Sequence, residues 1–563
     1  DDSHQPIGKI VWHKCPEEHP PPFQCGRMKA PLDYTNSSDP RTASIAVLKF
    51  PAGGQRQGSN KPMGTILLNP GGPGGSGVDF LARRTSETTR MANDLDKIMK
   101  GKYDLLSFDP RGIARTTPRA DCWNDEVAND YVNALEFEAM GLPHSRVGPN
   151  HLDSAAGLEL ARLDFAAKLC YRNETVTELM RYMGTTFVAR DMRLLSKASG
   201  DSDGLNYWGF SYGTVLGSVF ADMFPDEVHR LVIDGVVDVP NYLNGSWYDD
   251  LIDTDNVLYG FYEECAKSPQ GCALARKAED GSRKLQARDI RAKVTDFLEE
   301  LKIDPVPVVD ARIPGLVTYS LVVEALFQAL YRPKGWDQLA EALEPLISER
   351  NGTLFLESYG DAPLNTHPPS PSSDQAQIAI ACGDAKLEVP DKRWTIDGFK
   401  SFLSGLEEQS SLFGQLWVSI GAECLGFWRP RSVERHYGDF TSKTSFPLVM
   451  IGNDYDPVTP AAYADLMAEK FPNAVSVRRA GYGHCSMSQP SKCINQVVTD
   501  YFLEGKVPRE GVRCELDDVP LFKDKRQVSA GGLLHQSSSA APTDEELAWQ
   551  HLGDAIFDFN ARR

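Results

Sequence analysis

Short apolar or β-branched runs alternate with helix-like stretches over the first 240 residues. The predicted strands are Ser44–Phe50, Thr65–Asn69, Tyr103–Phe108, Leu205–Phe210 and Arg230–Asp234. Between the third and the fourth of these strands, the pattern predicts helices over Asp153–Cys170 and Thr175–Ala198. Apolar strands that alternate with helices form mostly parallel sheets covered on both faces, so this part of the chain predicts an α/β fold.

The pattern changes after residue 238. It is mostly helical over 239–442, and apolar strands then resume at Pro447–Gly452 and Ala474–Arg479. A second independent domain would not need the strands to resume. We therefore expect one α/β core, formed by residues 1–238 and 443–520, with a large helical insertion that acts as a lid or cap.

The chain becomes polar after Cys514. Residues 521–563 are expected to form a tail with a flexible link at Gln536–Pro542. Thr543 and Glu546 have the spacing of a capping box, which predicts a short last helix.

Composition and charge limit the classes of partner. Of the 563 residues, 41% are hydrophobic and 24% are charged, which is ordinary for a globular protein. The formal net charge is −19, and such a surface repels nucleic-acid phosphates and anionic lipids. The most apolar stretch, Gly315–Tyr331, contains Glu324 and is shorter than the roughly 20 residues of a membrane span. We expect no nucleic-acid or membrane partner, and we favour a monomer.

Cysteines and glycosylation sequons indicate the compartment. Asn-x-Ser/Thr sequons occur at Asn36, Asn173, Asn244 and Asn351. With Cys485 left unpaired, the cysteines expected to form disulfides are Cys15, Cys25, Cys122, Cys170, Cys265, Cys272, Cys382, Cys424, Cys493 and Cys514. Both features favour secretion, and the opening Asp-Asp-Ser-His is interpreted as a mature start after removal of a signal peptide. No zinc-type CxxC pair, HExxH or nucleotide motif is found, so no metal or other cofactor is expected.

A candidate nucleophile follows the strand Leu205–Phe210. The motif Gly209-Phe-Ser211-Tyr-Gly213 ends this strand, and the next residues have helical character. A sharp strand-to-helix turn of this kind exposes a serine hydroxyl at the carboxyl edge of a sheet. The short motif also arises by chance, but the strand before it and the helix after it favour a nucleophile.

A glycine-rich loop predicts the oxyanion hole. Residues Asn69–Gly77 read Asn-Pro-Gly-Gly-Pro-Gly-Gly-Ser-Gly directly after the strand Thr65–Asn69. Exposed backbone N–H groups in such a loop stabilise the negative charge of a tetrahedral intermediate. We assign the two donors to Gly72 and to Tyr212, the residue after the nucleophile.

The acid and the base are sought after Ser211, because this fold places them in the order serine, acid, histidine. Of the later histidines, only His484 lies in a glycine-rich loop just after a late strand. Asp454 and Asp456 both follow the strand Pro447–Gly452, and spacing alone does not choose between them.

Together these motifs resemble the α/β-hydrolases that include proline iminopeptidases and secreted tripeptidyl aminopeptidases. The matching segments are Asn69–Gly77, Phe108–Gly112, Gly209–Gly213, Leu231–Asp238, Asp456–Pro460, Gly483–His484 and a C-terminal region from Cys493 to Cys514. The resemblance implies that Asp456 is the acid and that Cys493 pairs with Cys514. The family pattern has glycine after the histidine, where this chain has Cys485.

The leading hypothesis is a secreted serine aminopeptidase that acts on short peptides, because a large cap excludes folded substrates. Such an enzyme must bind a free α-amine, and Asp238, Asp384 and Glu423 are candidates for this role. An alternative is an esterase, lactonase or amidase that acts on a small secondary metabolite with the same triad. A third hypothesis is an inactive hydrolase fold used for binding, against which the intact serine, aspartate and histidine argue.

Overall fold

The computed structural model describes residues 6–54, 61–86, 89–122, 141–245, 247–276, 284–360, 373–387, 394–426, 430–517, 520–522 and 543–555. Its centre is a ten-stranded sheet with the order β1-β2-β3-β5-β4-β6-β7-β10-β11-β12. The strands are β1 (Ile10–His13), β2 (Gln24–Pro31), β3 (Thr42–Phe50), β4 (Thr65–Asn69), β5 (Asp104–Phe108), β6 (Leu205–Phe210), β7 (Val228–Asp234), β10 (Val449–Tyr455), β11 (Val475–Tyr482) and β12 (Val512–Cys514).

Most neighbouring strands of this sheet are parallel, and antiparallel pairing is confined to the edge that contains β1, β2 and β3. Every residue of β4 and β6 is buried, which explains why these strands are continuous apolar runs in the sequence. The strands predicted at Thr65–Asn69 and Leu205–Phe210 are confirmed with the same bounds.

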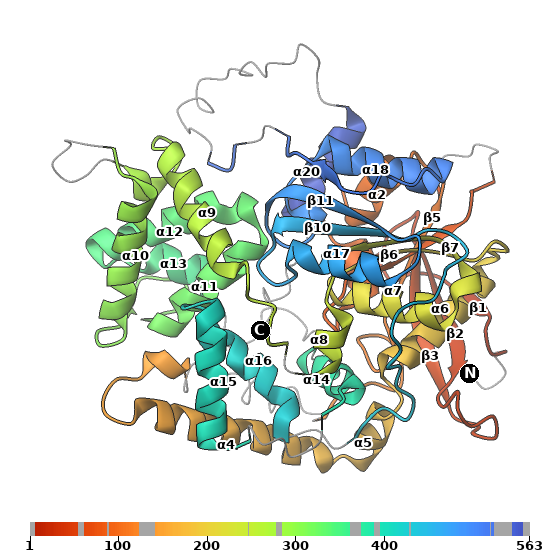
Figure 1. Ribbon diagram of the computed structural model, residues 1–563, viewed down its shortest axis with the longest axis horizontal. Helices are drawn as coiled ribbons and strands as arrows, with labels where there is room; N and C mark the ends of the chain where they lie inside the picture. The colour runs from red at the N-terminus through yellow and green to blue at the C-terminus, as the bar shows by residue number, and fades with distance from the viewer. Residues whose placement is uncertain are drawn as a thin grey trace.

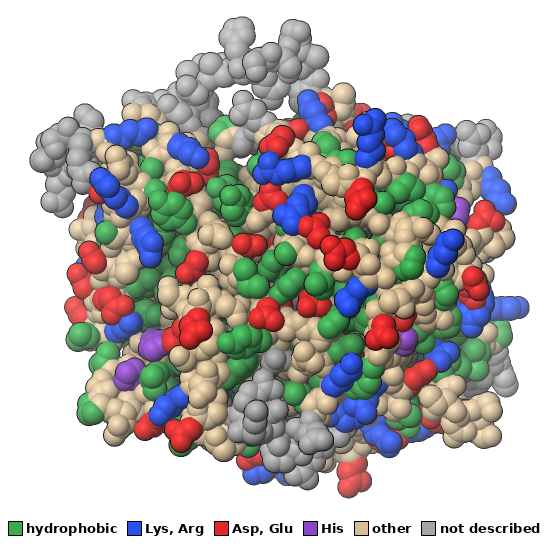
Figure 2. All heavy atoms as spheres, in the orientation of Figure 1, with side chains coloured by type: hydrophobic (Ala, Val, Ile, Leu, Met, Phe, Trp, Pro, Cys, Tyr) green, Lys and Arg blue, Asp and Glu red, His purple; other side chains and the backbone are tan. Residues whose placement is uncertain are grey.

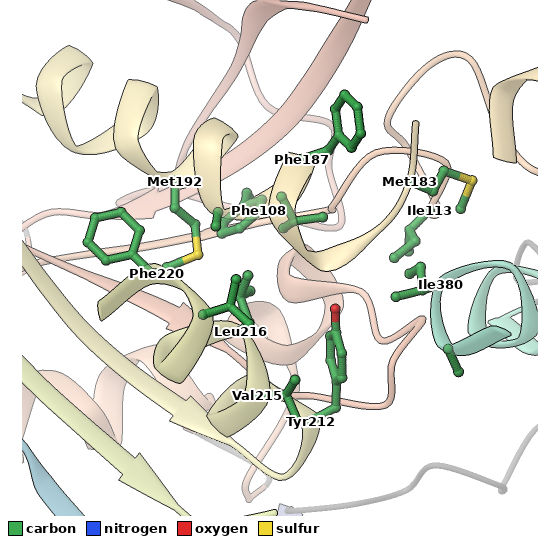
Figure 3. Close-up of a cluster of buried hydrophobic side chains, with 14 of the residues drawn as sticks. Phe108, Ile113, Met183, Phe187, Met192, Tyr212, Val215, Leu216, Phe220 and Ile380 are labelled. Atoms are coloured by element: carbon green, nitrogen blue, oxygen red, sulfur yellow. The ribbon is translucent and has the colours of Figure 1, made fainter. Parts of the chain in front are cut away.

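Helices cover both faces of the sheet (Figure 1). One face packs against α1 (Gly77–Ala82), α2 (Met91–Ile98), α18 (Lys492–Glu504) and α20 (Asp544–Ala555). The other face packs against α6 (Thr185–Ser199), α7 (Tyr212–Met223) and α17 (Ala461–Lys470). Figure 3 shows the second of these layers, where Phe108 of the sheet meets Leu216 and Phe220 of α7 and Met192 of α6. The α/β fold predicted from the sequence is confirmed.

A second group of helices lies beside the sheet and has its own hydrophobic core (Figure 1). It contains α9 (Thr254–Lys267), α10 (Ala287–Leu301), α11 (Tyr319–Tyr331), α12 (Trp336–Glu349), α13 (Thr353–Tyr359), α15 (Ile396–Gln409) and α16 (Gly414–Gly426). A small antiparallel pair, β8 (Val306–Val308) and β9 (Gly315–Val317), belongs to the same region. The helix α4 (His151–Tyr171) packs against α15 and α16, although it precedes the nucleophile in the chain. We call these helices and the β8–β9 pair the cap.

Two smaller helices connect the cap to the sheet. They are α8 (Val239–Leu243), which follows β7, and α14 (Ser373–Asp384), which packs against both α8 and α16.

The sequence-based prediction of one helix over Thr175–Ala198 is wrong. The structure has two helices, α5 (Glu174–Met180) and α6, which are separated at Gly184. A side chain at Gly184 would collide with Asp384 and Ser432. The tertiary contacts of this position therefore end one helix and start another.

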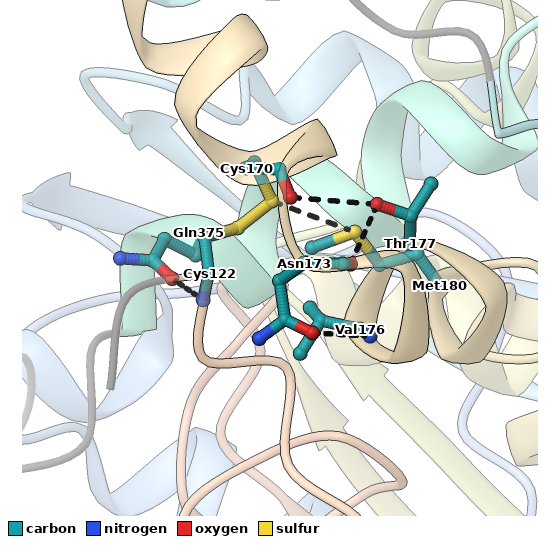
Figure 4. The surroundings of a disulfide bond; sticks show 7 residues. All are labelled: Cys122, Cys170, Asn173, Val176, Thr177, Met180 and Gln375. Atoms are coloured by element: carbon teal, nitrogen blue, oxygen red, sulfur yellow. Dashed lines mark hydrogen bonds between the residues drawn. A yellow bond between two sulfur atoms is a disulfide. The ribbon is translucent and has the colours of Figure 1, made fainter.

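Ten cysteines form five disulfides in the structure. They are Cys15–Cys25, Cys122–Cys170, Cys265–Cys272, Cys382–Cys424 and Cys493–Cys514. Figure 4 shows how Cys122–Cys170 joins the segment after β5 to the end of α4, beside Asn173. Cys485 is free, as predicted, and it is buried.

Acidic and basic side chains are interspersed over the face shown in Figure 2. Asn36, Asn244 and Asn351 are exposed, whereas Asn173 is half-buried and caps α5. Among the described helices, none combines the length and the apolar character needed to cross a membrane.

Candidate active site

Ser211 occupies a strained turn between β6 and α7. Its backbone angles are φ 56° and ψ −126°, a region that residues with a side chain rarely adopt. Hydrogen bonds hold the turn, because Ser211 N–H donates to Asp234 O over 3.0 Å and Thr214 N–H donates to Ser211 O over 2.7 Å. The turn therefore has the backbone geometry of a nucleophile elbow.

Glycines allow the neighbouring chain to approach this turn. A Cβ on Gly71 would lie only 2.9 Å from Ser211 Cβ and 3.0 Å from Tyr212 N. A Cβ on Gly213 would lie 2.9 Å from Asn69 O. The glycine-rich loop after β4 and the start of α7 are thus in direct contact, as the oxyanion-hole prediction requires.

The glycine-rich loop has a fixed backbone at this point. Gly71 and Gly72 have φ values of 96° and 115°, which glycine adopts readily. Gly71 N–H donates to Asn69 Oδ1 over 2.9 Å. The structure brings Gly71, which directly precedes the predicted donor Gly72, against Ser211 and Tyr212.

His484 is paired with Asp456 in a fully buried site. Its Nδ1 lies 2.9 Å from Asp456 Oδ1 and 3.1 Å from Oδ2, and Thr459 Oγ1 lies 3.2 Å from the same nitrogen. Asp456 also accepts backbone N–H bonds from Val458, Thr459 and Cys485. Burial disfavours the charged carboxylate, but His484 and these donors outweigh it and hold the pKa of Asp456 below its ordinary value.

Asp454 has a different role from Asp456. Its Oδ2 accepts hydrogen bonds from Nε and Nη2 of Arg513, over 2.9 and 2.6 Å. The strand β12 carries Arg513, so this carboxylate links the end of β10 to β12 across β11. Of the two aspartates that spacing alone left open, Asp456 is the one that contacts His484.

Asp234, at the end of β7, joins the nucleophile turn to the histidine loop. Its backbone oxygen accepts from Ser211 N–H over 3.0 Å and from Cys485 Sγ over 3.4 Å. Its side-chain Oδ1 accepts from Ser486 N–H over 2.7 Å. Burial raises the pKa of Asp234 to about 6. Since Cys485 and Ser486 directly follow His484, one residue holds the serine and the histidine segments next to each other.

Arg479 is a buried guanidinium under the histidine loop, and the sequence-based analysis missed it. It donates to Asn453 Oδ1 over 2.8 Å, to Gln489 O over 2.9 Å and to Tyr482 O over 2.9 Å. These bonds fix the backbone on both sides of His484. The sequence does contain a pattern that indicates the burial of Arg479. This residue lies two positions after the buried Val477 and so shares its face of the strand.

Cys485 takes the place of the family's glycine and keeps a glycine-like backbone, with φ 59°. Its sulfur would be 2.5 Å from a Cβ on Gly235, so the thiol fills the space between the histidine loop and β7. Burial raises its pKa well above the ordinary value. The thiol is therefore protonated and shielded from solvent.

Two of the three predicted amine-binding carboxylates already have partners within the chain. Asp384 accepts hydrogen bonds from Thr185 N–H over 3.0 Å, from Thr185 Oγ1 over 2.5 Å and from Tyr242 OH over 3.1 Å. Burial raises the pKa of Asp384 to about 6. Glu423 is half-buried and also has an interaction within the chain.

Asp238 differs from these two residues. Its Oδ1 is buried and has no hydrogen-bond partner among the described residues. Burial raises the pKa of Asp238, although the Asn241 N–H and the more distant Lys470 act in the opposite direction. Asp249 and Asp250 add further negative charge to this neighbourhood.

The sheet order, the strained Ser211 turn and the buried His484–Asp456 pair together define a serine hydrolase of the α/β-hydrolase class. Residues 410–514 match the family described as TAP-like protein. The chain thus has an α/β-hydrolase fold, and its residues 410–514 are similar to the TAP-like family.

Three curated relatives are similar to the chain over most of its length. Serine protease Hip1 of Mycobacterium tuberculosis is 27% identical over 505 residues, which cover 87% of each chain. Tripeptidyl aminopeptidase of Streptomyces lividans is 27% identical and covers 91% of this chain and 87% of its own length. Carboxylesterase B of Mycobacterium tuberculosis is 26% identical and covers 87% and 86%.

Proposed function

We propose that this chain is a serine aminopeptidase that releases short N-terminal pieces from peptides, with Ser211 as nucleophile, His484 as base and Asp456 as acid. The observation that carries the proposal is the buried His484–Asp456 pair, held beside the strained Ser211 turn by Asp234. Similarity to a protein named tripeptidyl aminopeptidase and to one named serine protease supports the peptide substrate.

The proposed reaction is acyl transfer. Because Nδ1 of His484 is engaged by Asp456, Nε2 is the nitrogen that takes the proton of Ser211. The serine oxygen then attacks the substrate carbonyl, and the N–H groups of Gly72 and Tyr212 stabilise the oxyanion. His484 donates its proton to the leaving amine, and water hydrolyses the acyl-enzyme by the same route.

We further propose that Asp238 binds the free α-amine of the substrate. Its buried Oδ1 lacks a hydrogen-bond partner among the described residues, and a buried carboxylate in that state is stabilised by a cation. It lies just beyond β7, four residues after Asp234, which contacts the nucleophile turn. An amine bound there would limit cleavage to a short distance from the peptide N-terminus.

The ester alternative keeps the same triad without this requirement. It is supported by the relative named carboxylesterase B. An ester, lactone or amide of a small metabolite would then be cleaved without a contribution from Asp238.

We also propose that the protein is secreted and glycosylated. Five disulfides are typical of an oxidising compartment. The sequons at Asn36, Asn244 and Asn351 are exposed. A change in mass on treatment with a glycosidase, and loss of that change in the Asn-to-Gln variants, would test the modification.

The experiment that tests the activity compares peptidyl anilides with a free and with a blocked N-terminus, alongside simple acyl esters. We expect cleavage of the free-amine peptides and loss of that cleavage in Ser211→Ala. Cleavage of esters alone would retain the triad and discard the peptide substrate. Full activity of a folded Ser211→Ala variant would contradict the assignment of the nucleophile.

A further inference from the structure

The C-terminal helix α20 is a part of the protein that the family similarity does not explain. The TAP-like match ends at residue 514, and α20 begins at Asp544. Its capping box is present, because Thr543 N–H donates to Glu546 Oε2 over 2.7 Å and Glu546 N–H donates to Thr543 Oγ1 over 3.2 Å. The helix is therefore an ordered element with a defined start, as the sequence predicted.

One face of α20 is embedded in the hydrophobic layer behind the sheet. Ala548, Trp549 and Leu552 are at most 3% exposed, and they share one side of the helix. The helix lies along α2, where its His551 Nδ1 is 3.4 Å from Asp94 Oδ1 (Figure 1). Lys492 of α18 forms an ion pair of 2.7 Å with Glu546.

Trp549 supports the strand that carries the proposed nucleophile. Its ring centroid is 6.2 Å from that of Trp208 in β6. Trp208 in turn packs against Phe210, at 5.1 Å between centroids. Phe210 immediately precedes Ser211. This row of aromatic rings therefore extends from α20 to the residue next to the strained turn.

The same helix contacts the segment after the proposed base. It packs against the 3-10 turn Ser486–Ser488, which begins two residues after His484. This turn is tied to the catalytic region, since Ser486 N–H donates to Asp234 Oδ1. A displacement of α20 would therefore reach the histidine loop directly.

A third contact links α20 to the cap. Lys334 Nζ donates to Gln550 O at the helix. Three residues earlier, Tyr331 packs its ring against His484 at 5.1 Å between centroids, and Tyr331 O accepts from His484 N–H over 3.2 Å. The cap turn that covers His484 is thus fixed to α20 at its other end.

We propose that α20 is a positioning element of the active site, and that Trp549 holds the Ser211 turn and the His484 loop in their reactive arrangement. This inference rests on the proposed function of Ser211 and His484. The helix contacts β6, the turn after His484 and the turn of the cap that packs against His484. Each of these three segments holds Ser211 or His484 of the proposed triad in place. Trp549 contacts neither substrate nor reacting atoms, so its effect passes through these neighbours.

The test is the full-length Trp549→Ala variant, with Asp544→Ala, at the exposed first residue of the same helix, as the control. We expect kcat for a chromogenic substrate to fall at least about tenfold, because small displacements of catalytic groups slow the chemical step. KM should change less than about twofold, because the substrate contacts are retained. Labelling of Ser211 by a fluorophosphonate should slow in parallel, and Asp544→Ala should behave as the wild type.

Rescue separates positioning from general stability. Trp549→Phe keeps an aromatic ring against Trp208 and should retain most of the kcat that Trp549→Ala loses. If Trp549→Ala does not fold, the Lys334→Met variant serves as the test instead. It removes the hydrogen bond from the cap turn to Gln550 O and should lower kcat in the same direction.

Two results would overturn the inference. One is a folded Trp549→Ala variant, or in its place Lys334→Met, with the kcat of the wild type. The other is a loss of kcat in Trp549→Phe as large as that in Trp549→Ala. Failure of the proposed function is recognised separately, because Ser211→Ala would then retain activity whatever the state of α20.

Discussion

Asp454 and Asp456 are two residues apart at the end of β10, and their surroundings separate their roles. Asp456 is fully buried and contacts His484, whereas Asp454 binds Arg513 at the surface. Asp456→Asn should lower kcat by about 10³–10⁴-fold. The variant lacks the negative charge that stabilises the protonated imidazole of His484, and it no longer fixes the tautomer of the neutral ring. Steady-state kinetics on the chromogenic substrate would measure this.

Asp454→Asn is the matched control for this prediction. It removes a carboxylate from the same strand end without touching His484, and kcat should stay within about twofold of the wild type. Equal losses of kcat in the two variants would show that a carboxylate at this strand end matters whether or not it contacts His484.

Asp238 gives a prediction about substrate recognition. Asp238→Asn should raise KM about tenfold for free-amine peptides, because a charge-assisted contact with the α-amine is lost. The blocked peptides should not respond. Asp226→Asn, which removes an exposed carboxylate near the opposite end of β7, is the control. An unchanged KM in Asp238→Asn would exclude this residue as the amine site.

The residues of the site were predictable where the backbone motif is local. Ser211 and His484 follow from glycine patterns next to strands, and the structure brings their segments together through Asp234. The choice between Asp454 and Asp456 was not available from spacing, because it depends on which carboxylate the fold buries. Arg479 was missed because an arginine in a strand is usually exposed.

At the scale of elements, the junction between α14 and α6 makes the stability depend on pH. Asp384 of α14 accepts from Thr185 at the start of α6, and burial raises the pKa of Asp384 to about 6. The native state therefore binds a proton that the unfolded chain has lost at the same pH. The contribution of Asp384 to the free energy of unfolding should fall, by up to about 3 kcal/mol, as the pH rises from about 4 to 6.

Urea unfolding of the wild type and of Asp384→Asn at a series of pH values would measure this contribution. The stability of the wild type relative to the variant should decrease over that pH range. A difference that is constant with pH would show that Asp384 titrates at its ordinary pKa.

Strands were predictable where they form continuous apolar runs. The buried strands β4 and β6 have the predicted bounds, whereas β1, β2 and β12 were not recognised. β2 has eight residues, but the polar residues Gln24, Arg27 and Lys29 interrupt its apolar positions. The break between α5 and α6 depends on α14, which is distant in sequence.

At the scale of the whole molecule, the disulfide Cys382–Cys424 joins α14, beside the core, to α16 of the cap. Replacing both cysteines by serine should lower the free energy of unfolding by about 2–4 kcal/mol, because the unfolded chain gains freedom. Chemical denaturation would measure this loss of unfolding free energy. The double variant Cys15→Ser and Cys25→Ser is the comparison, because the disulfide that it removes closes a shorter loop. An equal loss in both pairs would argue against the loop-length explanation.

The arrangement of strands has a consequence for biosynthesis. β7 and β10 are neighbours in the sheet, yet all of the cap except α4 lies between them in the chain. A ribosome therefore completes the serine turn long before it makes the strands that carry Asp456 and His484. The growing chain therefore holds an incomplete form of the proposed triad until these strands are made, and closing so distant a strand pair is slow. The proposed hydrolytic activity arises only once β10 and β11 have joined the sheet beside β7.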